Sequence, residues 1–303
     1  MIPKDETFNG TWPFQPHFCE AAGFSQHYVD IGEGEVIICL HGEPTWGYLY
    51  RNMIPPLAEN NRVIVPDHMG FGKSETPLDR EYTLKSHTEN LSALIDELSL
   101  DQITFVMQDW GGPIGTAFTV RHPEKVKRLV YMNTVAGYGV VSESVTPINQ
   151  SPWFKWIGEG LESGRTEQVL RNAGSTVLSI MKIIGFQNSS VIDDTWIDAY
   201  SSPFPSYESS IGAYEFPIDA YLGRIVDYVL EGAEGVPNLK SKPAILLEGL
   251  EDRAIPPDRA IEGFRSLWPD EKIIELEGVG HFCQEDAPDL LVSYIQEFLK
   301  VNP

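Results

Sequence analysis

Residues 105–115 place a carboxylate at the position where many hydrolytic enzymes keep their nucleophile. An apolar run from Phe105 to Met107 is followed by Gln108, Asp109 and Trp110, then by two glycines and a helical pattern. A strand, a tight turn and a helix in this order form a nucleophile elbow, which usually reads Gly-x-Ser-x-Gly and exposes its middle residue above a sheet. Here the middle residue is Asp109, and Gln108 replaces the first glycine. The sequence therefore predicts Asp109 as a nucleophile.

A carboxylate at an elbow indicates a particular chemistry. Carboxylate nucleophiles form a covalent ester and so divide one difficult step into two easier ones. We expect Asp109 to displace a leaving group from saturated carbon, whereas a serine at this position would attack a carbonyl. The alternative is that Asp109 only caps the following helix, which is a common role of Asp at a helix start. The partner residues described next favour the nucleophile.

A second motif supplies backbone donors. The apolar run Ile37 to Leu40 leads into a turn that reads His-Gly-Glu-Pro at 41–44. In proteins with a nucleophile elbow, one oxyanion-hole N–H comes from this loop and the other from the residue after the nucleophile. This assigns the backbone N–H groups of Glu43 and Trp110. The alternative is an ordinary turn before a helix.

A histidine near the end of the chain is the candidate base. His281 follows an apolar run and the segment Gly278-Val279-Gly280, which lets the chain turn and present an imidazole above the sheet. The alternative for any histidine is a solvated or core position. The remaining histidines lack this setting: His17, His27, His41, His68, His87 and His122.

An acid is needed to orient the base, and three carboxylates compete for that role. Asp252 follows the apolar run 244–247 and precedes a proline-marked helix start. It can accept a hydrogen bond from His281 and hold the ring. Glu251 and Glu248 are the rival acids. The strand that ends at Met132 offers no carboxylate in its following residues.

Tryptophans bear on the identity of the leaving group. An indole N–H donates a hydrogen bond and accepts none, which suits it to hold a departing halide in an apolar cavity. Trp110 adjoins the nucleophile, and Trp156 is the expected second donor, with Trp153 as the alternative and Trp196 as a further competitor. Each could instead be ordinary core packing.

The alternation of elements predicts where these residues meet. Continuous apolar runs are typical of strands buried on both faces of a parallel sheet, and helical patterns separate them. The expected strands are Val36–Leu40, Arg62–Val65, Ile103–Met107, Leu129–Met132, Ala244–Leu247 and Ile273–Leu276. The expected helices include Leu84–Leu98, Gly112–Arg121 and Pro288–Leu299. All four candidate motifs follow strands, where α/β sheets bind ligands.

The strand pattern stops between residues 136 and 236, which are rich in serine and helical patterns. We expect a helical cap there, inserted between two parts of one main domain at 1–135 and 237–303. The sheet pattern resumes after the insert in the same style, so the cap should lie over the carboxyl ends of the strands.

Composition excludes several classes of protein. Acidic residues outnumber basic ones 44 to 22, and the formal charge of −22 disfavours nucleic acid and anionic membranes as partners. Three cysteines without close spacing, Cys19, Cys39 and Cys283, favour neither a metal site nor a disulfide framework. No stretch is apolar enough to span a membrane, and no signal segment begins the chain. We expect a cytoplasmic protein without metal or cofactor.

Taken together, these motifs resemble those of the haloalkane dehalogenases. The resemblance rests on residues 41–46 with 48–51, 66–67 with 70–74, 108–112 and 280–282. It covers about residues 25 to 135 and 240 to 300 and is loose through the cap. It implies an α/β-hydrolase fold with a mostly parallel eight-stranded sheet. It also implies hydrolysis of haloalkanes to an alcohol, halide and a proton, with water as the second substrate.

Glu43 in the oxyanion loop and the acid at Asp252 resemble the subfamily whose second halide ligand is a cap tryptophan. An epoxide hydrolase is the nearest alternative, because such an enzyme shares the triad and uses cap tyrosines to open the epoxide ring of its substrate. The candidate tyrosines here are Tyr200, Tyr207 and Tyr214. A receptor or oxygenase on the same scaffold is a third interpretation, since fold does not fix function.

Overall fold

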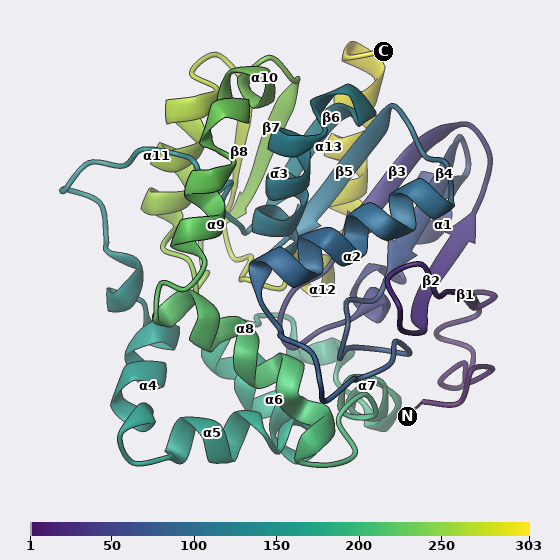
Figure 1. Ribbon diagram of the computed structural model, residues 1–303, viewed down its shortest axis with the longest axis vertical. Helices are drawn as coiled ribbons and strands as arrows, with labels where there is room; N and C mark the ends of the chain where they lie inside the picture. The colour runs from purple at the N-terminus through teal and green to yellow at the C-terminus, as the bar shows by residue number, and fades with distance from the viewer. Residues whose placement is uncertain (1) are drawn as a thin grey trace.

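An eight-stranded sheet forms the centre of the protein in a computed structural model that describes residues 2–303 (Figure 1). Its strands lie in the order β1-β2-β4-β3-β5-β6-β7-β8, and every neighbouring pair from β4 onward is parallel. β1 and β2 add an antiparallel edge. The strands are β1 His17–Cys19, β2 Gln26–Ile31, β3 Glu35–Leu40, β4 Asn61–Pro66, β5 Ile103–Gln108, β6 Val126–Met132, β7 Ala244–Gly249 and β8 Ile273–Leu276.

Helices cover both faces of this sheet. In Figure 1, α2 and α3 lie side by side in front of it, and α13 lies behind and contacts α1. Every residue of β5 and β7 is buried as a result, which is why these strands read as continuous apolar runs. The helices of the main domain are α1 Ile54–Ala58, α2 Leu84–Glu97, α3 Gly111–Arg121, α11 Pro257–Leu267, α12 Cys283–Asp286 and α13 Pro288–Val301.

The predicted mostly parallel eight-stranded sheet with flanking helices is confirmed, and the six expected strands correspond to β3 through β8. The edge strands β1 and β2 have no apolar run that would have indicated them. In β2 the buried polar side chains of Gln26 and His27 bond to Asp67, which follows β4. The strand is therefore held partly by side-chain hydrogen bonds, which leave no signal in hydropathy.

The elements between β6 and β7 are helical in the described residues: α4 Pro152–Leu161, α5 Arg165–Leu170, α6 Ala173–Ile184, α7 Asp194–Ser201, α8 Ile211–Tyr221, α9 Val226–Glu231 and α10 Val236–Lys240. Helices α4 to α8 gather at the lower end of the molecule in Figure 1. Helix α10 packs against α3 of the main domain. The sequence-based boundaries at 136 and 236 stay predictions.

Backbone hydrogen bonds tie this helical region to the loops that follow β7 and β8. The N–H of Trp153 in α4 donates to the carbonyl of Arg253, and the N–H of Arg253 donates to the carbonyl of Ile184 in α6. The N–H of Phe282 donates to the carbonyl of Gly185. The loops that carry Asp252 and His281 are therefore fixed to two of the overlying helices.

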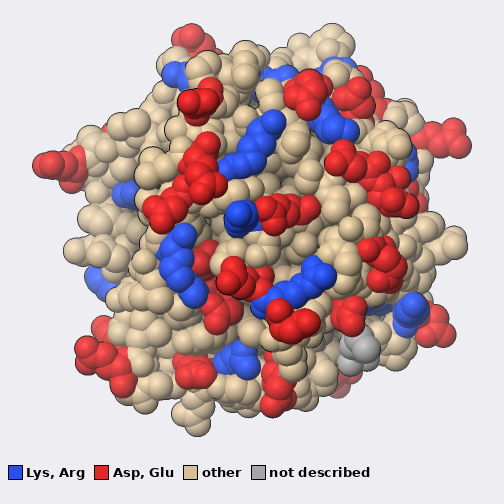
Figure 2. Space-filling view, in the orientation of Figure 1, with Lys and Arg blue, Asp and Glu red and all other residues tan. Residues whose placement is uncertain are grey.

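The surface carries charges of both signs, with acidic groups in excess. Figure 2 shows Lys and Arg interspersed among more numerous Asp and Glu side chains on one face. This distribution is that of a solvated surface rather than a basic binding patch. Within residues 2–303, no helix combines the length and the apolar character that crossing a bilayer requires.

The close approach of α3 to β3 gives a test of the fold. A Cβ atom on Gly111, the first residue of α3, would lie 2.3 Å from the backbone oxygen of Leu40. We expect Gly111→Ala to lower the free energy of unfolding by about 1–3 kcal/mol, as overpacking of a core does. Urea denaturation measures this. Gly263→Ala in α11 is the control, because its Cβ would lie 3.6 Å from Val141. Equal losses in both variants would contradict the expectation.

Candidate active site

Asp109 stands on a strained turn between β5 and α3. Its φ is 49°, in the left-handed region that non-glycine residues rarely adopt. The backbone is held there because the Thr134 hydroxyl donates to the Asp109 carbonyl, and because Gly42 lets the loop after β3 approach. A Cβ at Gly42 would lie 2.1 Å from Oδ1 of Asp109. Strain maintained by its surroundings is typical of a functional position.

The Asp109 carboxylate is partly fixed and partly free. Its Oδ1 accepts a hydrogen bond of 2.8 Å from the backbone N–H of Glu43, one of the two expected oxyanion donors. Among the described residues, the backbone N–H of Trp110 makes no hydrogen bond to this carboxylate. The Asp109 side chain is 16% exposed and lines a cavity. Oδ1 is therefore held in place while Oδ2 can reach a substrate.

His281 lies between two carboxylates. Its Nδ1 is 2.8 Å from Oδ2 of Asp252, and its Nε2 is 3.2 Å from Oδ2 of Asp109. The second pair is close enough for an ion pair but is not aligned as a hydrogen bond. The ring is fully buried, and the side-chain amide of Gln108 donates to the His281 carbonyl at 3.1 Å. Gln108, which replaces the usual elbow glycine, thus ties the elbow to the histidine loop.

Asp252 has a complete set of hydrogen-bond donors. Its Oδ1 accepts from the backbone N–H groups of Ala254 and Ile255 at 2.7 and 2.9 Å. Its Oδ2 accepts from the Asn133 amide at 3.0 Å in addition to His281. Asn133 follows β6, where no carboxylate was found, and contributes a donor to the acid instead. These donors hold the Asp252 carboxylate in a fixed orientation beside the His281 ring.

The two rival acids are placed differently. Glu251 is exposed, whereas Glu248 is fully buried on β7 and neither of its carboxyl oxygens has a hydrogen-bond partner. Burial, together with the charge of Asp252, raises the pKa of Glu248 well above its usual value. Neither carboxylate contacts the His281 ring, so the geometry favours Asp252 as the orienting acid.

The charge on His281 depends on both neighbouring acids. Burial alone would lower the pKa of His281, but the charge of Asp252 and the contacts with Asp109 outweigh it and raise the pKa to about 10. With Asp109 ionised, the imidazole is therefore protonated at neutral pH. Removal of the negative charge on Asp109 would lower the pKa of His281.

A cavity of about 250 Å³ lies above Asp109. Its wall includes Trp153, the alternative cap tryptophan; Trp156, the expected one, is not part of the wall. Trp156 instead stacks on the outer side of Trp153, with centroids 5.3 Å apart and planes within 6°. Trp196 packs among Phe186 and Tyr200 away from the cavity.

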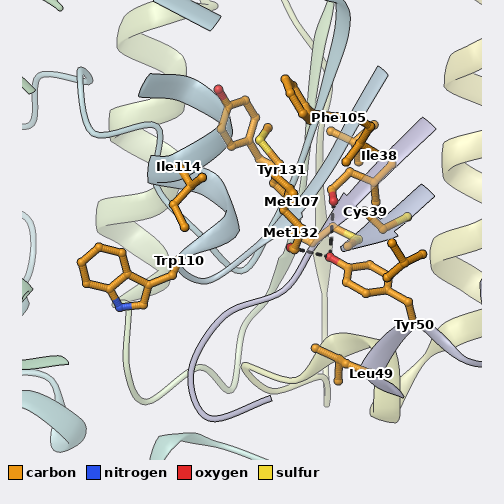
Figure 3. Close-up of a cluster of buried hydrophobic side chains, with 14 of the residues drawn as sticks. Ile38, Cys39, Leu49, Tyr50, Phe105, Met107, Trp110, Ile114, Tyr131 and Met132 are labelled. Atoms are coloured by element: carbon orange, nitrogen blue, oxygen red, sulfur yellow. Dashed lines mark hydrogen bonds between the residues drawn. The ribbon is translucent and has the colours of Figure 1, made fainter. Parts of the chain in front are cut away.

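Trp110 also lines this cavity. Its ring stacks on Phe216 of α8 at 4.6 Å, and Figure 3 shows it apart from the side chains that cluster around the strands. Among the described residues, neither the Trp110 nor the Trp153 indole N–H donates to a protein acceptor, whereas Trp46 Nε1 donates to Ala199. Two indole donors in the cavity wall are therefore unused by the protein.

The carboxyl of Glu43 is a site group that its motif did not indicate, because only the backbone N–H was expected there. The side chain lines the cavity, is 3% exposed, and leaves Oε1 without a partner. Burial and the charge of Asp109 raise the pKa of Glu43 well above its usual value. An acidic residue at position 43 was visible in the sequence, but its direction depends on the turn.

The epoxide-hydrolase alternative is not supported by the tyrosines proposed for it. The Tyr200 hydroxyl donates to buried Glu285, and the Tyr207 hydroxyl donates to Glu167 at the surface. Tyr200, Tyr207 and Tyr214 are all absent from the cavity wall, where Tyr221 is the one tyrosine among the described lining residues.

We expect Asp252→Asn to lower the pKa of His281, since Asp252 contributes the largest raising effect. NMR titration of the imidazole measures this, and Glu251→Gln, which alters an exposed carboxylate one residue away, should leave the pKa nearly unchanged. The folded-state pKa of about 10 exceeds the unfolded value of about 6.5. The ion pairs therefore stabilise the fold fully below about pH 6.5 and lose this effect as the pH rises toward 10.

Wild type should have a higher free energy of unfolding than Asp252→Asn at pH 6, and this difference, the stability gap, should become smaller at pH 10. Denaturant unfolding at both pH values checks it. A gap that widens with pH would show that His281 is neutral in the folded protein and would contradict the assigned ion pairs.

The chain is similar to known proteins along most of its length. The alpha/beta hydrolase fold family matches residues 35–288. A cis-3-alkyl-4-alkyloxetan-2-one decarboxylase of Shewanella oneidensis is 32% identical over 95% of this chain and 89% of its own length. Haloalkane dehalogenase 2 of Mycobacterium tuberculosis is 29% identical over 94% of this chain and 95% of its own.

Solved structures agree with this fold. The haloalkane dehalogenase DpaA from Paraglaciecola agarilytica superposes with a TM-score of 0.73 at 26% identity, covering 94% of this chain and 92% of its own. DatA from Agrobacterium tumefaciens, at 22% identity, gives 0.80 over 95% and 97%. The resemblance to haloalkane dehalogenases is thus confirmed, and the chain belongs to the α/β-hydrolase family.

Proposed function

We propose that this protein is a haloalkane dehalogenase, which hydrolyses carbon–halogen bonds through an alkyl ester on Asp109. One observation carries the proposal: the Asp109 carboxylate faces a cavity whose wall holds two indole rings, Trp110 and Trp153, with unused N–H donors. A carboxylate nucleophile requires a leaving group on saturated carbon, and indole donors suit a leaving group that departs as an anion without needing a proton.

In the first step, Oδ2 of Asp109 attacks the carbon that carries the halogen, and the carbon–halogen bond breaks with its electrons on the halide. Charge builds on the halogen in a cavity with few polar groups, so donors that are already in place there stabilise the transition state. Trp110 and Trp153 supply these donors. The Glu43 N–H keeps Oδ1 oriented, so that only Oδ2 turns toward the substrate.

In the second step, His281 acts as a base toward water. Ester formation removes the charge of Asp109, which is one cause of the raised pKa of His281. The pKa of the imidazolium falls, and the ring loses its proton to solvent. The neutral ring can then take a proton from water, whose oxygen attacks the ester carbonyl carbon. Oδ1 becomes the oxyanion and is stabilised by the Glu43 N–H, while Asp252 stabilises the imidazolium. Collapse breaks the bond to the alkyl oxygen, which leaves as the alcohol with the proton of the added hydroxyl, and regenerates the Asp109 carboxylate beside the protonated His281. The proton that His281 gave to solvent before hydrolysis is the one that the overall reaction releases.

The raised pKa of Glu43, which favours its protonated form, fits this scheme. A second carboxylate beside Asp109 would repel it and would be costly to bury. A neutral acid avoids that repulsion and can still exchange hydrogen bonds with a water molecule near the ester. The unpartnered Oε1 is consistent with that role.

A second candidate function is decarboxylation of an oxetan-2-one, because two relatives with that name are 32% and 31% identical to this chain. The ring oxygen of such a lactone is also a leaving group on saturated carbon, so the same nucleophile would serve. Halide release from 1-bromobutane, compared with carbon dioxide release from a cis-dialkyl oxetanone, separates the two activities.

His281→Gln should form the alkyl ester but fail to hydrolyse it, since its base is lost. Mass spectrometry after incubation with 1-bromobutane should show one added butyl group, located on Asp109 by peptide mapping. The double variant Asp109→Ala, His281→Gln is the control and should remain unmodified. A butyl group in that control, or full turnover by His281→Gln, would refute the assigned roles.

The two cavity tryptophans should bind halide through their N–H groups. Trp110→Phe and Trp153→Phe keep an aromatic ring, and each should reduce the rate of the first step by about a hundredfold. Trp156→Phe is the matched control, because this ring stacks on Trp153 outside the cavity. Rapid-quench kinetics and bromide quenching of fluorescence measure the effects. If Trp156→Phe slows the first step and weakens bromide quenching while Trp153→Phe does neither, Trp156 is the second halide donor.

A further inference from the structure

The cavity has one charged group besides the acidic residues at its inner end. Asp109 and Glu43 lie at the bottom, and apolar side chains such as Val135, Ile255 and Tyr221 form most of the wall. Arg259 is the only cationic residue among the described residues that line it. A cation in an otherwise apolar wall suggests recognition of a particular ligand group.

The Arg259 guanidinium has no recorded partner. The residue is half-buried in the first turn of α11, where a cation gains nothing from the helix dipole. Within residues 2–303 it makes no hydrogen bond, ion pair or aromatic contact through its side chain. By contrast, Arg51, Arg62 and Arg224 each pair with a carboxylate.

The acids nearest to Arg259 on its own helix are engaged elsewhere. Asp258 accepts hydrogen bonds from the backbone and hydroxyl of Thr146, and Glu262 accepts them from Ser142. Both carboxylates therefore hold the loop that follows β6. The five donors of the guanidinium remain available to a group that enters the cavity.

Arg259 also lies where the main cavity meets a second one of about 120 Å³. The two cavities share Arg259 and Val135, and the smaller is bounded by Gly137 and Gly139 of the same loop. Asn149, an exposed amide in the wall of the main cavity, offers a further donor. The outer end of the cavity thus has both donors and room for a planar anionic group.

We propose that Arg259 binds a carboxylate at the end of the substrate opposite the reacting carbon, so that ω-haloalkanoates are a preferred substrate class. That the substrate carries a halogen at its other end rests on the proposed dehalogenase function. The planar fork of arginine matches a carboxylate with two parallel hydrogen bonds. The chain carries a formal charge of −22 and repels anions at long range, so a local cation is needed to accept such a substrate.

The test compares ω-bromoalkanoates, from 4-bromobutanoate to 8-bromooctanoate, with the ω-bromoalcohols of equal length, in wild type, Arg259→Gln and Arg259→Lys. Arg265→Gln is the matched control, because this exposed arginine lies on the same helix outside the cavity. For the alkanoate that fits best, Arg259→Gln should lower kcat/KM by about 10- to 100-fold, mainly through KM. The loss with the matching alcohol should be at least tenfold smaller, and Arg259→Lys should retain part of the activity.

Calorimetric binding of hexanoate, which needs no turnover, separates this proposal from the proposed function. Binding that weakens in Arg259→Gln but not in Arg265→Gln supports the carboxylate site even if no bromide is released; that result would refute only the dehalogenase. Hexanoate that does not bind wild type, or binds Arg259→Gln equally well, overturns the proposal. The proposal is also overturned if bromide is released but kcat/KM for the alkanoates equals that for the alcohols, both in wild type and in Arg259→Gln.

Discussion

The site depends on one buried ion cluster, in which the His281 ring lies between the carboxylates of Asp252 and Asp109. Charges without water are costly unless they are paired and hydrogen-bonded. Asp252 meets this condition through two backbone N–H groups and the Asn133 amide, and Asp109 through the Glu43 N–H. Each of these donors comes from a loop at the end of a strand. The strand order therefore brings together the loops whose donors stabilise the buried charges of Asp109 and Asp252.

The same cluster couples the two halves of the proposed reaction. While Asp109 is charged, it holds the proton on His281 and is itself held ready to attack. When Asp109 becomes an ester, one of the charges that raise the pKa of His281 disappears, and the imidazolium becomes easier to deprotonate. Burial and the charge of Asp109 raise the pKa of Glu43, which disfavours a second negative charge beside Asp109. In the proposed reaction, the change in the basicity of His281 thus follows from the change in charge on Asp109.

The sequence predicted the parts of the molecule that local rules determine. Glycines that a turn requires, and apolar strands of a doubly covered sheet, identified the elbow, the His281 loop and strands β3 to β8. Features that depend on contacts between distant segments were not predictable. Strand β2 is held by side-chain bonds to Asp67, and whether Trp153 or Trp156 faces the cavity depends on how α4 is tied to the Arg253 carbonyl. One helical turn separates the two tryptophans, and periodicity alone does not say which faces the cavity.

The sheet and the overlying helices contribute different groups to the site, which is consistent with one fold being shared by relatives with different names. A carboxylate nucleophile with a timed base serves any substrate that carries a leaving group on saturated carbon, whether halide or a ring oxygen. What distinguishes these substrates is the donor that receives the leaving group and the groups that hold the rest of the molecule. In the function proposed above, those groups are Trp153 of α4, Trp110 against Phe216 of α8, and Arg259 of α11. On this proposal, selectivity depends on α4, α8, α11 and the start of α3, which surround the cluster held by the strand-end loops.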